Sequence, residues 1–430
     1  AIQTLVKITS INAIITINPR ALERAAELDR QFAESGFVGS LHGIPFIVKD
    51  NYDTHDLPTT NGTLAMKDSY PPDDAYQIRK IREAGAVVLA KSNLAEFAMS
   101  GAFTVSSVLP GYTRNPYDPL RVTAGSSGGT AAAIAARFCA GAQGTDTMGS
   151  VRLPAAYCGL VGLKPNYSLI STRGVVPLSY GLDHVDPLCR SARYISLMLD
   201  VLTGYDAACV ESIYPHCALH ARAMNLAGLR FAVPLNDAAT PFGKGIWENF
   251  KDCITKLEDH GAIQVSCSLP DPDPTRSRLA GLLICEAEAG HTLQGDVLTS
   301  PGDFSKEFQK VLGCGRDATA HHLVATQRHL VAVGLRFRKL FDEADLLLLP
   351  TAPQTAFPFE QLPLEGQANL TQWANHAGCP ALSLPCGLSP DGMPLGLQLI
   401  GPPLADGQLL AMAQAIQPLL PQLTMPELEE

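Results

Sequence analysis

The stretch TAGSSGGTAAAIAARFCAGAQGTDTMGSVRLP, residues 123–154, decides which fold the whole chain is expected to adopt. It contains two turns of small residues, 125–129 and 144–150, on either side of an alanine-rich segment typical of a helix packed closely on a sheet. Glycines in both turns allow the backbone angles that a nucleophile loop and a close substrate approach require. Ser126 and Ser150 lie 24 positions apart (150 − 126) and can face each other. Backbone N–H groups just before a serine can also stabilise an oxyanion.

Three motifs of the chain occur in the order found in one enzyme family. GSSGG followed by GTDTMGSVRLPA closely resembles the signature of the amidase signature family of serine amidohydrolases, and GIPFIVKDN, residues 43–51, is similar to its strand with the catalytic lysine. Two spaced glycine-serine motifs with a lysine motif are more specific than one short pattern. The resemblance covers nearly the whole chain, more weakly between about 210 and 340. Further similar segments are residues 61–62, 82–93, 113–118, 159–165, 347–351 and 393–401.

The resemblance implies a catalytic triad. Ser150 would be the nucleophile, Ser126 a bridging serine that follows a cis peptide bond, and Lys49 the base. It also implies two further sets of residues: oxyanion donors at the backbone N–H groups of Thr147, Met148 and Gly149, and substrate contacts at Met99, Ser100 and Ser126.

The residue types fit amide hydrolysis on chemical grounds as well. The reaction requires a nucleophile, a proton carrier and a site for the oxyanion. No histidine lies in the signature stretch, so a relay that ends at a lysine is the consistent alternative for moving the proton. Lys49 must then be neutral, which requires burial to lower its pKa from about 10.4. Asp50 would oppose this, and strand alternation predicts that it points elsewhere.

Each triad residue also has a plain structural interpretation. Lys49 alone would be interpreted as a surface lysine that ends a strand, Ser126 as a helix N-cap and Ser150 as a turn serine. Their occurrence together favours the relay. Asp146 and Arg152 bracket the nucleophile, and we expect them to hold the loop rigid.

Two positions depart from the family pattern, which usually has glycine at both. Met148 keeps its N–H, so the oxyanion site is retained unless the loop requires a positive φ there. Its side chain is expected to narrow the pocket. Asp186 places a charge in a turn that is neutral in the family, and the sequence assigns it no role.

Composition limits the possible partners and the compartment. The chain has 430 residues, 46% hydrophobic and 17% charged, which is typical of a globular protein with a large core. A net charge of −10 argues against nucleic acid and anionic membranes as partners. The 11 cysteines include no Cys-x-x-Cys pair, which is typical of reduced thiols in a cytoplasmic protein. We expect no signal peptide and no membrane span.

No cofactor and no metal are expected. His216 and His220 are four positions apart without an evident third ligand, and a zinc site needs three or four. The cluster of His321, His322 and His329 is interpreted as a solvated helix face. GSSGG lacks the Gly-Lys-Ser/Thr continuation of a phosphate loop.

Strand and helix patterns alternate along the chain and predict an α/β fold. We expect one large amidase domain, residues 1–430, with a central mixed β-sheet covered by helices on both faces. Within it lie a signature core at about 43–204, a more variable helical part at about 210–340, and C-terminal strands and a helix at 345–417. The rigid PDPDP segment, residues 270–274, is the best candidate for an internal boundary.

The predicted function is hydrolysis of the C–N bond of a small amide through a serine acyl-enzyme, with release of ammonia or an amine. One alternative is the glutaminase component of a tRNA-dependent amidotransferase, which would need partner subunits. An alternative of another class is a non-catalytic binding protein on an amidase scaffold. The expected partner is a small-molecule amide. Whether the protein forms a homodimer is left open by the sequence. The identity of the amide is open, because a fold does not determine a substrate.

Overall fold

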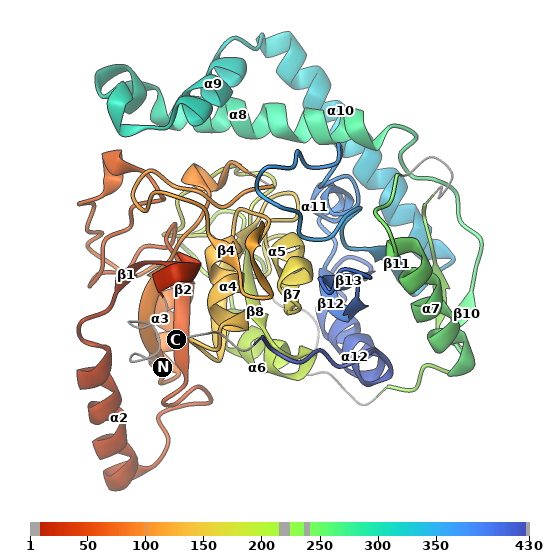
Figure 1. Cartoon of the computed structure of the whole chain (residues 1–430), viewed down its shortest axis with the longest axis horizontal. Helices are drawn as coiled ribbons and strands as arrows, with labels where there is room; N and C mark the ends of the chain where they lie inside the picture. The colour runs from red at the N-terminus through yellow and green to blue at the C-terminus, as the bar shows by residue number, and fades with distance from the viewer. Residues whose placement is uncertain (1–8, 101, 215–223, 236–240, 427–430) are drawn as a thin grey trace.

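The computed structural model describes residues 9–100, 102–214, 224–235 and 241–426 (Figure 1). Within them, eleven strands form one sheet in the order β1-β3-β2-β6-β8-β7-β12-β13-β11-β9-β10. A separate hairpin is formed by β4 (Arg114–Asn115) and β5 (Asp118–Val122). The strands of the large sheet are β1 (Ile14–Ile17), β2 (Pro45–Lys49), β3 (Val87–Ser92), β6 (Gly141–Asp146), β7 (Val161–Lys164), β8 (His184–Cys189), β9 (Arg230–Ala232), β10 (Ile263–Gln264), β11 (Leu346–Pro350), β12 (Ala381–Leu388) and β13 (Pro394–Ile400).

The sheet is mixed, as predicted. Parallel pairs occur in two groups, β3-β2-β6 on one side and β11-β9-β10 on the other. The strands between them, from β6 through β8, β7, β12 and β13 to β11, pair antiparallel. The strand–helix–strand alternation of the sequence therefore describes the parallel strands on the two flanks of the sheet. The strands in its centre are antiparallel.

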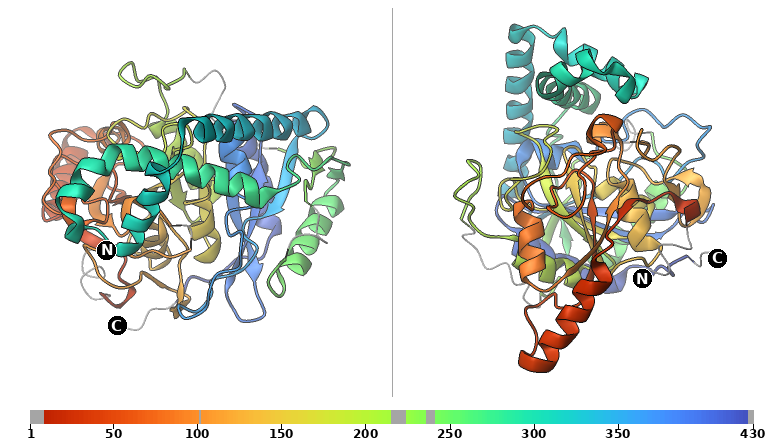
Figure 2. Two further views of the ribbon diagram at one scale, coloured as in Figure 1. Left: turned by 90° about the horizontal axis from the view of Figure 1, so that it is seen from above. Right: turned by 90° about the vertical axis from the view of Figure 1, so that its left-hand side faces the viewer.

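Helices cover both faces of the sheet (Figures 1 and 2). Alternate residues of β2 show the division: Ile47 packs with the alanines of α4 (Gly128–Ala135), whereas Phe46 and Val48 belong to the core on the other face. That second core includes residues of α3 (Tyr76–Glu83), α6 (Ala192–Leu202), α7 (Ile246–Asp259) and α12 (Asp406–Ile416). Alanine allows α4 to approach the sheet closely, and every residue of this helix is buried.

Three helices form a further layer beyond one end of the sheet, two across the top of Figure 1 and the third running down from there on the right. They are α8 (Pro274–Thr299), α9 (Lys306–Arg316) and α10 (Ala320–Arg338). The chain enters this layer directly from the PDPDP segment, since α8 begins at Pro274. None of the helices in the described part of the chain is both long and apolar enough to cross a membrane.

The apolar residues at 263–267 predict a strand of five residues, but β10 ends at Gln264. The sequence patterns did not predict β6, β7 or β8, although these strands form the middle of the sheet. In β6, GAQGTD has almost no large apolar residue, yet all six residues are buried.

Candidate active site

The three predicted triad residues lie on neighbouring elements at one end of the sheet. Lys49 is the last residue of β2, and β2 pairs in parallel with β6. Ser126 precedes α4, and Ser150 lies in the loop between β6 and α5 (Arg152–Tyr157). The Ser127 N–H donates to the Ser150 carbonyl oxygen at 3.2 Å, which joins the two serine loops directly.

Lys49 is fully buried and contacts Ser126. Its Nζ lies 2.7 Å from Ser126 Oγ and 2.7 Å from Thr145 Oγ1. Burial lowers the pKa of Lys49 to about 7, against the opposing negative charges of Asp183, Asp186 and Asp146. A lysine with this pKa is substantially neutral near pH 7 and can accept a proton. The sequence did not indicate Thr145, because its contact with Lys49 depends on the pairing of β2 with β6.

Asp50 points away from this site, as strand alternation predicted. Its carboxylate forms an ion pair with Lys91 Nζ at 3.0 Å, and both side chains are fully buried. The negative charge of Asp50 is therefore paired with Lys91 and not with Lys49.

The peptide bond between Gly125 and Ser126 is cis, as the family resemblance implied. A Cβ at Gly125 would lie 2.5 Å from the Ser100 carbonyl oxygen, so glycine is required for this close approach. Ser126 is not the helix N-cap, because that position belongs to Ser127. The helix-cap interpretation of Ser126 is therefore wrong.

The backbone N–H groups of the loop before Ser150 differ in their hydrogen bonding. Among the described residues, neither the Thr147 N–H nor the Met148 N–H has an acceptor within the protein. The Gly149 N–H instead donates to Asp146 Oδ1 at 2.6 Å. The expectation that Gly149 is a third oxyanion donor does not fit this geometry, since its proton is already engaged.

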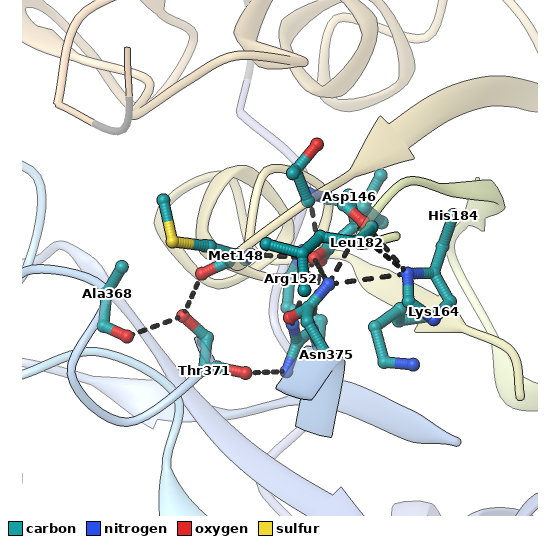
Figure 3. A network of polar contacts seen from close by, with 12 residues as sticks. Asp146, Met148, Arg152, Lys164, Leu182, His184, Ala368, Thr371 and Asn375 are labelled. Atoms are coloured by element: carbon teal, nitrogen blue, oxygen red, sulfur yellow. Dashed lines mark hydrogen bonds and ion pairs between the residues drawn. The ribbon is translucent and has the colours of Figure 1, made fainter. Parts of the chain in front are cut away.

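The left-handed backbone conformation in this loop falls on Gly149, at φ +127°, and Met148 is not among the residues with positive φ. Methionine is thus compatible with the loop. Its carbonyl oxygen accepts a hydrogen bond from Thr371 Oγ1 at 2.6 Å (Figure 3). A Cβ at Gly149 would collide with the same Thr371 hydroxyl at 2.3 Å, so glycine is needed at position 149.

Asp146 and Arg152 form a buried clamp around the loop, as predicted (Figure 3). Two Arg152 nitrogens donate to the two Asp146 carboxylate oxygens, each at 2.9 Å. Arg152 also donates to Gln398 Oε1 and Asn375 Oδ1, both at 2.6 Å. Burial alone would raise the pKa of Asp146, but Arg152 holds that pKa below its ordinary value. Asp146 is therefore ionised, and its charge is fully paired.

A cavity of about 590 Å³ opens at Ser150. Its lining includes the predicted Met99 and Ser100 together with Thr147 and Met148. Apolar side chains of α8, such as Leu282 and Cys285, form one wall, and residues 362–368 form another. Ser126 lies fully buried behind the cavity and is not among the described residues that line it.

Asp186 lies in the interior of the sheet, opposite Gly144 of β6. It is fully buried, and neither carboxylate oxygen has a hydrogen-bond partner among the described residues. Burial raises the pKa of Asp186 well above its ordinary value, and the nearby Asp146 charge adds to this effect.

The histidines singled out by the sequence are not gathered at this site. His321, His322 and His329 lie on α10, and His329 Nε2 is 2.9 Å from Ser277 Oγ. His216 and His220 fall outside the described residues. Within the described ranges, one possible ligand group occurs, His55, Asp56 and Asp74, but Arg82 pairs with both of its carboxylates at 2.6 and 3.1 Å.

The family model for Amidase matches residues 4–410. The chain belongs to the amidase family. Among curated proteins, it is 34% identical to the A-subunit of Glutamyl-tRNA(Gln) amidotransferase from Thermosynechococcus vestitus, over 96% of this chain and 91% of that protein. Thus the resemblance stated from the motifs is confirmed.

Solved structures of amidase relatives share the fold. The native peptide amidase of Stenotrophomonas maltophilia matches at a TM-score of 0.86, with 28% identity over 99% of this chain and 93% of the other. A structure from an inhibitor-bound protein complex, described in connection with the origins of an s-triazine catabolic enzyme, matches at 0.90 with 27% identity, over 98% and 94% of the two chains. The Glutamyl-tRNA(Gln) amidotransferase A-subunit from Thermotoga maritima matches at 0.81 with 28% identity, over 96% and 95%.

Proposed function

We propose that the protein is an amidohydrolase that cleaves the C–N bond of a small linear amide through an acyl-enzyme on Ser150. The observation that carries this proposal is the 2.7 Å contact between Lys49 Nζ and Ser126 Oγ. Together with the lowered pKa of Lys49, it provides a buried base at hydrogen-bond distance from a hydroxyl that can relay a proton.

The proposed first step forms the acyl-enzyme. Ser150 Oγ attacks the amide carbonyl carbon, its proton passes to Ser126 Oγ, and the Ser126 proton passes to Lys49 Nζ. The carbonyl oxygen gains the negative charge, which the Thr147 and Met148 N–H groups stabilise. Lys49 then returns the proton through Ser126 to the departing nitrogen, and the C–N bond breaks.

The second step hydrolyses the acyl-enzyme. A water molecule attacks the ester carbon, and its proton follows the same relay to Lys49. Collapse of the intermediate returns a proton to Ser150 Oγ and releases the carboxylic acid. No cofactor is required, since each proton that Lys49 accepts is returned within the cycle.

The apolar part of the cavity favours amides with an apolar acyl portion. The lining includes the apolar Met148, Leu153, Leu178 and Leu282, and also the charged Arg278, Glu286 and Glu365. Apolar surface of this kind binds apolar groups by removing them from water, at about 25 cal/mol per Å².

The test is covalent labelling of the purified protein with a fluorophosphonate, followed by peptide mass mapping. Ser150 should carry the label, and Ser150→Ala should abolish both labelling and ammonia release from a panel of aliphatic and aryl amides. Ser35→Ala, at an exposed hydroxyl on α2 (Ala21–Ser35), is the matched control and should behave as the unmodified protein. Labelling at another serine, or turnover by Ser150→Ala near the original rate, would contradict the proposal. Absence of any labelling would instead favour a non-catalytic binding protein.

A second candidate is the glutaminase component of an amidotransferase. The 34% identity to the A-subunit of Glutamyl-tRNA(Gln) amidotransferase supports it. Glutamine should then be the preferred amide, and the protein should co-purify with further subunits when it is isolated under native conditions from its source. Rapid turnover of simple amides by the isolated chain, with none of glutamine, would exclude this candidate.

A further inference from the structure

Asp183 lies in the segment between β7 and β8, one residue before β8 begins, and connects three parts of the site. Its Oδ1 accepts a hydrogen bond from Thr147 Oγ1 at 2.6 Å. Its Oδ2 accepts the Leu178 N–H at 2.8 Å and the Ser179 N–H at 3.0 Å. Thr147 and Leu178 both line the cavity at Ser150. The Asp183 carboxylate thus links two parts of the site. One is the loop before Ser150, through Thr147, and the other is the cavity wall at Leu178.

Asp183 also lines a second cavity, of about 390 Å³, together with Thr145, Ser179 and His184. Thr145 is the residue whose hydroxyl contacts Lys49. Asp183 and the partner of the Lys49 amino group, Thr145, therefore line the same cavity.

We propose that Asp183 is a positioning residue of the amidase reaction: its hydrogen bond from Thr147 holds the start of the loop before Ser150, and its carboxylate places a negative charge near the contact between Thr145 and Lys49. This inference rests on the proposed function, because it gives Lys49 and the loop their catalytic roles.

The electrostatics agree with this geometry. Among the charges that raise the pKa of Lys49 against burial, Asp183 contributes most. Burial raises the pKa of Asp183 itself to about 6, while its hydrogen bonds from Thr147, Ser179 and Leu178 oppose the rise. At pH 7 the carboxylate is therefore mostly ionised and acts on Lys49 as a negative charge. The titratable groups that interact electrostatically with Asp183 are Lys49, Tyr52, Tyr167, Cys285 and Glu288.

Three variants separate the hydrogen bond from the charge. Asp183→Asn removes the charge but can keep the contacts, since the amide oxygen can accept the two N–H groups and the amide nitrogen can donate to the Thr147 hydroxyl. Thr147→Val removes the hydrogen bond and keeps both the charge and the backbone N–H. Asp183→Ala removes both.

The readout is the rate of Ser150 labelling by a fluorophosphonate between pH 5 and 9, which requires no knowledge of the natural substrate. In Asp183→Asn, the acid midpoint should fall by about one pH unit, because a negative charge near Lys49 has been removed, and most of the plateau rate should remain. In Thr147→Val, the midpoint should stay in place and the plateau rate should fall at least tenfold. Asp183→Ala should show both changes.

Asp29→Asn, at an exposed position of α2, changes the net charge equally and should leave the profile in place. Thermal unfolding of each variant ensures that only folded protein is compared. An unchanged midpoint in Asp183→Asn would overturn the charge role, and an unchanged plateau in Thr147→Val would overturn the loop role. If the unmodified protein is not labelled at Ser150 at all, the proposed function itself has failed, and this inference fails with it.

Discussion

Met148 is the position at which a single change should alter substrate choice most clearly. The Met148→Ala substitution removes roughly three heavy atoms from a half-buried side chain that lines the cavity at Ser150. The backbone should stay in place, because the φ of Met148 is not positive and its carbonyl oxygen is held by Thr371 Oγ1 at 2.6 Å. The N–H that we assign to the oxyanion is then retained.

The size of the effect follows from the vacated volume. At about 0.8 kcal/mol per buried methylene, an acyl group that fills the space of three heavy atoms gains up to about 2 kcal/mol. This corresponds to a rise of about 30-fold in kcat/KM. Amides too small to reach the space should change by no more than about threefold, since their oxyanion contacts are the same.

The assay is kcat/KM for both proteins over a series of linear amides of increasing acyl length. Gly281→Ala is the opposite perturbation, because a Cβ on Gly281 of α8 would lie 2.8 Å from Met148 Sδ and press the thioether toward the cavity. It should reduce kcat/KM for the longer acyl groups and leave the short ones nearly unaffected. A similar large gain on every amide in Met148→Ala would refute the argument, since it would mean that methionine impairs the oxyanion site itself.

Three further predictions follow from the site. First, kcat/KM should rise with pH through about 7, because Lys49 must be neutral; at pH 6 it should be about one-tenth of its plateau, and a flat profile from pH 6 to 8 would contradict a lysine base. Second, Arg152→Met should lower the free energy of unfolding by about 3 kcal/mol in a urea titration, because Asp146 would remain buried without its cation; the double variant with Asp146→Asn should recover part of the loss, and its failure to do so would count against the clamp. Third, dialysis against a chelator should leave turnover intact, since the relay uses protein groups alone; a loss that zinc restores would contradict the serine mechanism.

The sequence predicted those parts of the fold that carry a strong local pattern. β2 and β3 are short apolar runs, and α7 shows a helical spacing of buried residues. β6 could not be found in this way, because its burial depends on strands on both sides and on α4 above it. The antiparallel centre was missed for the same reason, since β7 and β8 become neighbours of β12 and β6 only in the assembled sheet.

The motifs indicated the candidate catalytic residues but not the groups that hold them. Lys49, Ser126 and Ser150 each lie in a short glycine-rich or strand motif, so local spacing was sufficient. Asn375 and Thr371 contact the Arg152 and Met148 region across more than 200 positions. No periodic pattern in the sequence predicts a contact between segments so far apart.

The long-range contacts also explain how the loop before Ser150 accommodates a methionine at position 148. This loop is held in place by hydrogen bonds from side chains. Asp146 engages the Gly149 N–H, Thr371 the Met148 carbonyl oxygen and Asp183 the Thr147 hydroxyl. Only position 149 adopts a backbone conformation that favours glycine. Position 148 is therefore free to carry a side chain, and this side chain can change the shape of the cavity at Ser150 without altering the backbone N–H groups of the loop.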